Sequence, residues 1–334
     1  MDAAARTPEA DVADVAASAA SAGGIADTAG PDFKVHAVLC SVQIFFGIFH
    51  VVAKAVLAEM DPLALAGLRV LGAAPLLLAV AWHYDRVRPR LRDLPALALL
   101  GALGVFANQV LFILGLARTT ATNAAILMVS VPVLAVGVAA LLRIERLGPR
   151  RLLGVALAVA GALVLLDPGR LHLGPGVALG NALILTNGLC YATFLVLQRP
   201  LLARLPWRTV IAWAFLLGGI FVLCVAAPAL VRLPATPVSA RTWWGVAYIV
   251  LFPTALGYAL STWAVRRSSP ALVAAYNTLQ PLVACLLAAS LLGERFGVPQ
   301  AVGFALILAG LAQVSGRPRN GNGRSADRPF PKPS

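Results

Sequence analysis

Long apolar runs separated by short polar connections make up most of this chain. Ten runs can be traced, near residues 35–58, 62–84, 94–116, 123–142, 151–167, 176–198, 208–231, 242–265, 271–292 and 300–315. A helix needs roughly 20 apolar residues to cross a bilayer, and backbone polar groups in lipid must be hydrogen-bonded within the protein. The pattern therefore predicts an all-α polytopic membrane protein with ten transmembrane helices.

Composition agrees with a protein whose main partner is the lipid bilayer. Of the 334 residues, 60% are hydrophobic and 12% are charged, and the mean hydropathy is +0.84. A soluble domain of this length needs more charge to cover its surface. The net charge of +13 does not indicate nucleic-acid binding, because the basic residues are scattered between apolar runs without interleaved aromatic residues.

Cysteine spacing gives no sign of a disulfide or a metal site. Cys40, Cys190, Cys224 and Cys285 each stand alone inside an apolar run, without a CxxC pair. No Walker A sequence is present, so we do not expect the chain to hydrolyse ATP itself. Neither a cofactor nor a metal is predicted.

Two polar tails flank the apolar region. Residues 1–33 are rich in Ala, Gly and Ser and carry six acidic residues against one arginine, which does not fit a signal peptide. Residues 316–334 are rich in Gly, Pro and Arg. Both segments are predicted to be disordered cytoplasmic tails.

Basic residues between the runs predict the orientation. With the N-terminus in the cytoplasm, 20 lysines and arginines fall on the cytoplasmic side and 5 on the other, while Lys54 and Arg69 lie within runs. Cytoplasmic loops of membrane proteins carry an excess of Lys and Arg. We therefore predict a multi-pass protein of the cell (cytoplasmic) membrane with both termini in the cytoplasm and an even number of spans.

The second half of the sequence repeats the first. Between residues 118 and 161, 15 of 44 ungapped positions are identical to those 149 further on, among them Pro132 with Pro281 and Glu145 with Glu294. Residues 34–167 and 176–315 would then form two repeats of five spans each. Because five is odd, the second repeat would enter the membrane from the opposite side, and such inverted repeats are typical of transporters.

Several local motifs resemble those of one family. They are Phe46-Gly47 followed by Lys54, where the family usually has Trp-Gly and Lys; Pro62 and Arg69; the stretch Asn108–Ala117; Pro132 and Glu145; and Tyr276-Asn-Thr-Leu-Gln-Pro281 with Gly293-Glu294. Together they resemble the drug/metabolite transporter superfamily, EamA family with two EamA repeats, over roughly residues 35–315. The resemblance implies a central cavity lined by spans 1–4 and 6–9, peripheral spans 5 and 10, and transport, often export, without ATP.

Polar residues at helical spacing within the runs mark the predicted substrate pathway. Its members are His50, Lys54, Arg69, Asn108, Gln109, Asn187, Tyr191, Tyr258, Tyr276, Asn277 and Gln280. Pro132, Pro253 and Pro281 interrupt helical hydrogen bonding and are predicted hinges. The alternative is that these polar groups only hold helices together. Lys54 could instead reach the membrane interface or pair with Glu59 or Asp61. Arg69 could instead cap the carbonyls of a kinked helix or pair with Asp61.

The charges inside the runs suggest the substrate. Lys54 and Arg69 are both basic, and no acidic residue lies inside a run. A guanidinium suits a carboxylate, so we predict a zwitterionic or anionic small-molecule substrate, such as an amino acid, with Arg69 at its acidic end. Without a carboxylate relay, a facilitator is favoured, or coupling through His50.

Other functions fit the sequence less well. A multidrug efflux carrier is the main alternative. An intramembrane enzyme would need grouped His/Asp or Ser/His residues, and His83 lacks such a partner in the sequence. A receptor or scaffold is disfavoured because no sizeable soluble domain is present. A homodimer is left open.

Overall fold

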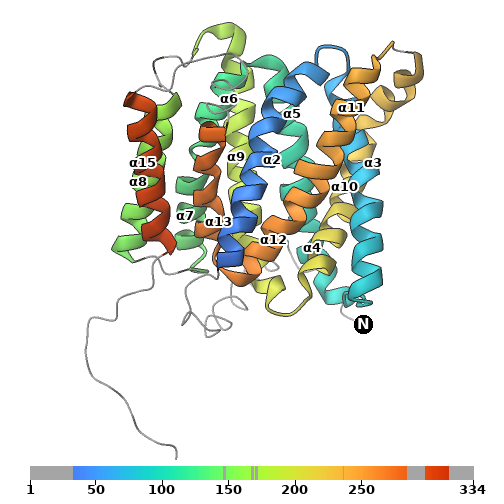
Figure 1. The fold of residues 1–334 in the computed structure, drawn as a ribbon. Helices are drawn as coiled ribbons and strands as arrows, with labels where there is room; N and C mark the ends of the chain where they lie inside the picture. Colours follow the sequence, from blue (N-terminus) through green and yellow to red (C-terminus); the bar gives the residue numbers. More distant parts are fainter. Residues whose placement is uncertain are drawn as a thin grey trace, which may run out of the picture.

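The computed structural model describes residues 33–145, 148–166, 169, 172–235, 237–283 and 298–315. These residues form a bundle of helices that run up and down between two ends (Figure 1), and the described ranges contain no strand. The all-α prediction is therefore confirmed. The predicted tails lie outside the described residues, except for Phe33, which begins the first helix. The motif residues Gly293 and Glu294 also lie outside the described residues.

The helical segments of each half follow the apolar runs. The first half contains α2 (Phe33–Val56), α3 (Pro62–Tyr84), η1 (Leu91–Asp93), α4 (Leu94–Gly101), η2 (Ala102–Ala107), α5 (Asn108–Arg118), α6 (Ala121–Met128), α7 (Val131–Leu141) and α8 (Pro149–Leu166). The second half contains α9 (Pro175–Leu202), α10 (Trp207–Arg232), η4 (Leu233–Ala235), α11 (Ala240–Ile249), η5 (Val250–Leu256), α12 (Gly257–Arg267), α13 (Pro270–Tyr276), η6 (Asn277–Leu279) and α15 (Val298–Ser315).

Several helices begin at residues whose side chains can cap a helix N-terminus. The Asp61 side chain accepts hydrogen bonds from the first amides of α3, and Pro62 occupies the first helical position. Thr120, Ser239 and Ser269 cap α6, α11 and α13 through their hydroxyl groups. Asp61 is thus used as a cap, and not as the ion-pair partner considered for Lys54 or Arg69.

Eight helical segments of the described chain are long and apolar enough to cross a membrane. They are Phe33–Val56, Pro62–Tyr84, Leu91–Arg118, Asn123–Leu141, Pro149–Leu166, Pro175–Leu202, Trp207–Ala235 and Ala240–Arg267. The ninth predicted run is described only to residue 283, as α13, η6 and a short helical continuation. The tenth is α15, with a shorter apolar helix at Ala301–Ser315. Ten spans therefore remain a prediction.

The bounds of the helices repeat at the interval found in the sequence. When the first half is shifted by that interval, α8 coincides with α15, since Pro149 falls on Val298 and Leu166 on Ser315. The same shift places Arg118, the last residue of α5, on Arg267, the last residue of α12. In these two helix pairs, the sequence repeat is therefore also a repeat of helix lengths and ends.

Helical irregularities repeat as well. η2 and η5 are π-helical segments, and the start of η5 lies within one residue of the position that the sequence repeat gives for the start of η2. A π segment adds a residue to the turn and often marks a functional site. η5 contains Pro253, whereas Gly104 occupies the matching position of η2, so proline is not required for this geometry.

The other two predicted hinge prolines also lie at helix breaks. Pro132 is the second residue of α7, directly after the turn that separates α7 from α6. Pro281 lies just beyond η6, where the helix tightens to 3₁₀ geometry. The breaks are observed features, while their use as hinges stays a prediction.

Two helix pairs make the most extensive contacts between the halves. α3 packs against α10, and α8 packs against α15 at the outer edge of the bundle (Figure 1). In the second pair, Gly154 and Gly161 face Gly310 and Gly303. A Cβ atom built on Gly161 would lie 2.5 Å from the Gly303 carbonyl oxygen. Small residues allow this close approach of two helix backbones.

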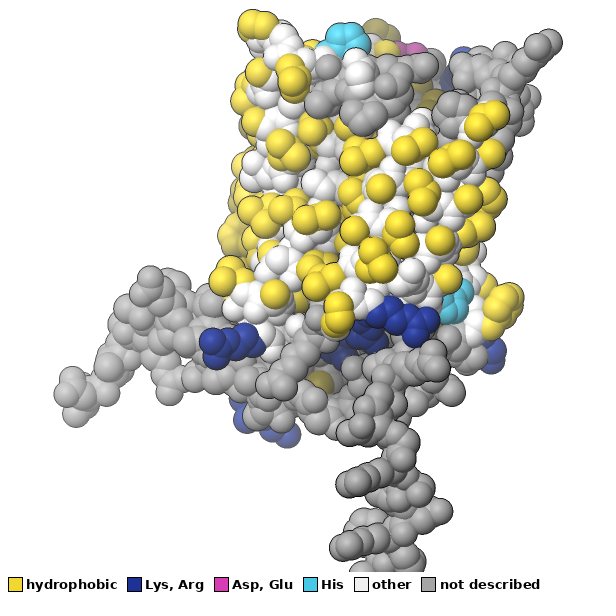
Figure 2. All heavy atoms as spheres, turned by 90° about the vertical axis from the view of Figure 1, so that its left-hand side faces the viewer, with side chains coloured by type: hydrophobic (Ala, Val, Ile, Leu, Met, Phe, Trp, Pro, Cys, Tyr) yellow, Lys and Arg dark blue, Asp and Glu magenta, His cyan; other side chains and the backbone are white. Residues whose placement is uncertain are grey.

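The outer surface is apolar between two polar ends. Figure 2 shows the α8–α15 side, with hydrophobic side chains over most of its height and Lys and Arg gathered at one end. The exposed apolar side chains of the described parts of these helices include Leu152, Leu153, Val164, Val298, Val302, Phe304 and Leu308. We call the end that carries Tyr84, Arg88, Arg143, Arg151 and Arg267 the basic end, and the other the opposite end. An apolar band of this kind fits lipid contact better than water.

Candidate functional site

A small cavity lies in the interior of the bundle. Its volume is about 40 Å³, and it is lined by Phe46, Phe49, His50, Arg69, Asn108, Phe112, Met128, Asn187, Tyr191, Tyr258, Asn277 and Gln280. The lining comes from α2, α3, α5, α6, α9, α12 and the helical segment after α13, and none of it from α8, α10 or α15. A cavity of this size holds one or a few water molecules, so an amino acid requires the bundle to open.

Arg69 is the cationic side chain of the described lining. It projects from α3 and is 2% exposed. Its Nε donates a hydrogen bond to Thr254 Oγ1 at 2.9 Å, and its guanidinium carbon lies 4.9 Å from the centre of the Phe49 ring. The Thr254 hydroxyl donates in turn to the Ile249 carbonyl, a bond of 2.7 Å that spans the π segment η5. The π segment thus orients a partner of the buried cation.

Amide and phenol groups form a second polar side of the cavity. The Tyr258 hydroxyl donates to Asn108 Oδ1 at 2.6 Å, and Asn187 Nδ2 donates to the Asn108 carbonyl at 2.6 Å. Gln280 Nε2 donates to Gln43 Oε1 at 2.9 Å. Among the described residues, Asn187 Oδ1 and Asn277 Nδ2 have no hydrogen-bond partner. Buried polar groups normally are bonded, so these two atoms are available to a water molecule or a substrate.

His50 adds a group that can accept a proton. Its Nδ1 lies 2.7 Å from the Phe46 carbonyl oxygen. A carbonyl only accepts, so Nδ1 carries the hydrogen and Nε2 is the acceptor of the neutral ring. Nε2 is buried and has no partner in the described part of the chain. The geometry therefore leaves an imidazole acceptor in the cavity wall.

Aromatic rings complete the wall of the cavity. Tyr191 and Tyr258 were predicted to line the pathway, whereas Phe46 and Phe49 were not. Phe49 stacks on Phe112 with ring centres 5.4 Å apart, and Tyr191 meets Tyr258 edge to face at 6.3 Å. Phe46 packs against both Phe49 and Tyr258. These rings provide an apolar surface beside a cation and several amides, which suits a small molecule with both polar and apolar parts.

Three predicted pathway residues lie outside the lining. The Lys54 ammonium donates to the carbonyls of Leu116 (2.8 Å) and Thr119 (2.9 Å) at the end of α5. Gln109 is fully buried, without a partner for either amide atom among the described residues. The Tyr276 hydroxyl is hydrogen-bonded to His36, and its ring borders a separate lateral pocket next to α15. A pathway role for these three stays a prediction.

A network at the opposite end joins the halves above the cavity. The Thr119 hydroxyl donates to Asn181 Oδ1 at 2.6 Å, and Asn123 Nδ2 donates to the same oxygen at 3.0 Å. Asn123 and Asn181 also donate to the His172 carbonyl. We call Lys54, Thr119, Asn123, His172 and Asn181 the opposite-end network. It ties α5 and α6 of the first half to α9 of the second.

Possible metal ligands do not cluster in the described ranges. No group of three or more His, Cys, Asp or Glu side chains comes together there. The described cysteines Cys40, Cys190 and Cys224 are free thiols.

Comparison with known proteins gives a family match and similar transporters. The model of the EamA-like transporter family matches this chain twice, over residues 34–167 and 178–316. A probable terminal-alkyne amino-acid exporter of Streptantibioticus cattleyicolor is 35% identical, over 79% of this chain and 88% of its own. Protein WALLS ARE THIN 1 of Arabidopsis thaliana is 28% identical, over 89% and 85%. One solved crystal structure, 18% identical, has a TM-score of 0.67 and covers 84% of this chain and 96% of its own.

Proposed function

Because this chain belongs to the EamA-like transporter family, we propose that it carries a small zwitterionic or anionic metabolite, such as an amino acid, across the cytoplasmic membrane. It acts as a secondary transporter or facilitator by alternating access. The ten spans form two inverted repeats, with the basic end and both termini in the cytoplasm. Export is the proposed direction, supported by the similar protein that is named as a probable amino-acid exporter.

The observation that carries the substrate class is Arg69. It is a buried guanidinium in the cavity wall, and the described lining contains no carboxylate to neutralise it. Buried charges are normally paired, so a substrate carboxylate is the natural partner. Within the described ranges, the guanidinium is hydrogen-bonded through Nε to the neutral Thr254 hydroxyl. The amides and Tyr258 then contact the remaining polar groups of the substrate.

Alternating access follows from the size of the cavity. The space beside Arg69 is too small for an amino acid, so the walls must separate toward one end and then the other. The π segments and the breaks next to Pro132 and Pro281 supply places where helices can bend. The repeat of helix bounds supports two related halves that rock about the cavity.

Flux of paired analogues tests the substrate class. Purified protein in liposomes is expected to move amino acids faster than their amides or esters. In Arg69→Gln, flux of the carboxylates should fall by at least on the order of tenfold, the effect of losing a charged hydrogen bond. Arg69→Lys keeps the positive charge but loses the paired donors of the guanidinium, so it should retain part of the flux. Arg118→Gln, at the exposed end of α5, serves as the control.

Two outcomes would reverse the proposal. Equal loss of carboxylates and amides in a folded Arg69→Gln protein would remove the carboxylate contact. Faster flux of a cationic drug than of any amino acid would favour the multidrug alternative. Flux should also follow the substrate gradient after the pH gradient is collapsed; uphill flux driven by pH alone in His50→Ala would instead reveal another proton carrier.

A further inference from the structure

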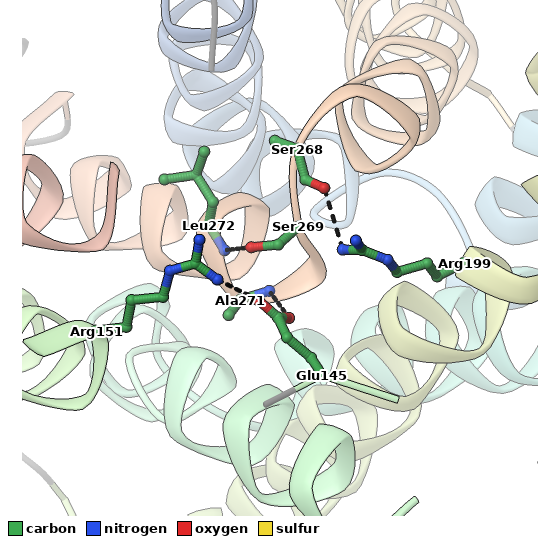
Figure 3. A network of polar contacts seen from close by, with 7 residues as sticks. All are labelled: Glu145, Arg151, Arg199, Ser268, Ser269, Ala271 and Leu272. Atoms are coloured by element: carbon green, nitrogen blue, oxygen red, sulfur yellow. Dashed lines mark hydrogen bonds and ion pairs between the residues drawn. The ribbon is translucent and has the colours of Figure 1, made fainter. Parts of the chain in front are cut away.

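A buried carboxylate at the basic end stands apart from the cavity. Glu145 follows α7, and its side chain is only 6% exposed. In the sequence, Glu145 lies at the end of an apolar run next to Arg146, which favours a surface ion pair or a helix-end residue. Arg146 lies outside the described residues. The structure corrects this interpretation, because the carboxylate is enclosed among four elements (Figure 3).

The contacts of Glu145 come from both halves. Arg151 of α8 donates to Oε1 at 3.3 Å, and the Ala271 amide at the start of α13 lies 3.5 Å from Oε2. The Ser269 hydroxyl also lies against the carboxylate, and Arg199 of α9 acts on it through its charge. Arg199 itself donates to the Ser268 carbonyl at 3.1 Å. Figure 3 shows these side chains converging on the turn between α12 and α13.

The same helices connect this cluster to the cavity. On α9, Tyr191 lines the cavity, and Gln198 lies seven residues, or about 10 Å, nearer the basic end. On α12, Thr262 lies one turn below Tyr258 in the same direction. Gln198 and Thr262 are fully buried, and their side-chain polar atoms have no partner among the described residues. Buried, unbonded polar groups between a cavity and a surface are expected where water enters when helices part.

The two ends differ in how deeply their acidic contacts are buried. At the opposite end, Glu59 accepts bonds from the Ser239 amide (2.9 Å) and hydroxyl (3.1 Å), which also join the halves. Those bonds are exposed to solvent, so they contribute little. Breaking the contacts of Glu145 costs more, because it would leave buried groups unpaired.

We propose that Glu145 is the latch that closes the substrate path at the basic end. It holds the end of the first half against the α12–α13 turn of the second half, with Arg151 and Arg199 completing the closure. When Glu145 and the turn separate, α9 and α12 part below Tyr191 and Tyr258, and water reaches Gln198 and Thr262. This role rests on the proposed function, in which the cavity is the substrate site.

Accessibility of a cysteine below the cavity tests the latch. Thr262→Cys is placed in a chain whose native cysteines are replaced, and a membrane-impermeant maleimide is applied from the basic side in sealed vesicles. Leu91→Cys, exposed at the same end, reports sidedness and normalises the rate. With Glu145 intact, position 262 should react slowly. Glu145→Arg places a third cation beside Arg151 and Arg199 and should speed the reaction by at least on the order of tenfold, the effect of losing one charged hydrogen bond.

Three further variants make the result specific to the latch. Adding Arg151→Glu to Glu145→Arg restores an opposite-charge pair and should slow the reaction again. Arg199→Gln releases the Ser268 carbonyl and should accelerate it, which keeps the test usable if Glu145→Arg does not fold. Asp93→Arg is the matched control, because Asp93 is a buried acid of the basic end that pairs with Arg204 at 3.5 Å.

The assay needs no substrate, so it is separate from the flux test. An unchanged rate at position 262 in folded Glu145→Arg and Arg199→Gln proteins would overturn the latch and leave transport standing. Equal acceleration by Asp93→Arg would also overturn it, because general loosening of the basic end would then explain the result. Absence of any flux, with the latch behaviour intact, would instead overturn the proposed function.

Discussion

Lys54 is a basic residue within a span, and its hydrogen-bond partners are backbone carbonyl oxygens. Its ammonium binds the carbonyls of Leu116 and Thr119, which are left without helical partners where α5 ends. A cation at a helix C-terminus is worth up to about 1 kcal/mol when partly exposed. Lys54→Gln should therefore lower the free energy of unfolding by about 1 kcal/mol, read as a lower thermal midpoint in detergent. Lys54→Arg keeps the positive charge, so its thermal midpoint should stay close to that of the wild type.

Substrate preference separates this role from a place in the pathway. If the Lys54→Gln protein transports substrates with the same order of preference as the wild type, Lys54 has a structural role. If the order changed while the thermal midpoint did not, Lys54 would contact substrate, as the sequence suggested.

Glu145 is expected to make closure of the basic end depend on pH. Burial raises the pKa of its carboxyl above the ordinary value, and the opposing effects of Arg199, Ser269, Arg151 and the Ala271 amide do not cancel it. When the basic end opens, the carboxyl becomes hydrated and its pKa returns toward 4.5. The closed form therefore binds the proton more tightly, so closure is strongest below pH 4.5 and weakens as the pH rises through the raised pKa.

Labelling at different pH measures this response. The rate at Thr262→Cys, divided by that at Leu91→Cys, should fall as the pH is lowered toward 4.5, because the ratio removes the ionisation of the thiol itself. Glu145→Gln keeps an acceptor oxygen without charge, so it should stay closed and lose the pH dependence. A ratio that rises on acidification would mean that the ion pair with Arg151 outweighs burial.

Residue types decide which parts of the site can be found in the sequence. Asn108, Asn187 and Tyr258 stand out because polar groups are costly inside apolar runs, and Arg69 stands out because it is charged. Phe49 does not, since an apolar ring looks the same whether it faces lipid or a cavity. Glu145 looked like a surface residue, because its burial depends on the α12–α13 turn, which lies far away in the sequence.

At the scale of helices, the α8–α15 contact depends on the absence of side chains. A Cβ on Gly161 would approach the Gly303 oxygen to 2.5 Å and the Ile307 nitrogen to 2.8 Å, and backbone atoms cannot move aside cheaply. Gly161→Ala should therefore destabilise the protein by about 1–3 kcal/mol. Gly137→Ala, in α7, is the control, because nothing lies within 4 Å of its Cβ position.

Thermal unfolding in detergent distinguishes the two alanines. Gly137→Ala should change the free energy of unfolding by less than about 1 kcal/mol, toward greater stability, because alanine favours helix. Equal midpoints for the two variants would mean that α8 and α15 are not held together as closely as the structure has them.

Helix positions follow from the sequence more readily than helix shape. Apolar runs locate each span because lipid requires continuous internal hydrogen bonding. The π segments are harder to find, because one inserted residue shifts the periodicity over too few turns to be recognised. Pro253 hinted at η5, but η2 has Gly104 in the equivalent place and gave no such hint.

For the whole molecule, orientation is the prediction with the widest consequences. Most of the described basic residues lie at the basic end, as the charge bias requires if that end is cytoplasmic. Reporter fusions after residues 90 and 334 should both read cytoplasmic. An extracytoplasmic signal from either fusion would contradict ten spans and, with them, the inverted relation of the two repeats.

The two ends of the bundle use related contacts. Lys54, near the end of the first helix, binds the Thr119 carbonyl just after α5. Arg199, near the end of α9, binds the Ser268 carbonyl just after α12, and Ser268 is the counterpart of Thr119 in the sequence repeat. Each half thus carries a cation that binds the end of its third span, which is α5 in the first half and α12 in the second. Closure by the Glu145 latch is added to this shared plan at the basic end.

The pairing of α3 with α10 and of α8 with α15 means that surfaces, rather than the polypeptide link, hold the halves together. Two fragments, residues 1–169 and 170–334, produced in the same membrane should therefore assemble, provided that each inserts in its own direction. What the single chain supplies is stoichiometry. It ensures that every copy of one half meets one copy of the other, which a pair of free fragments would have to find by diffusion.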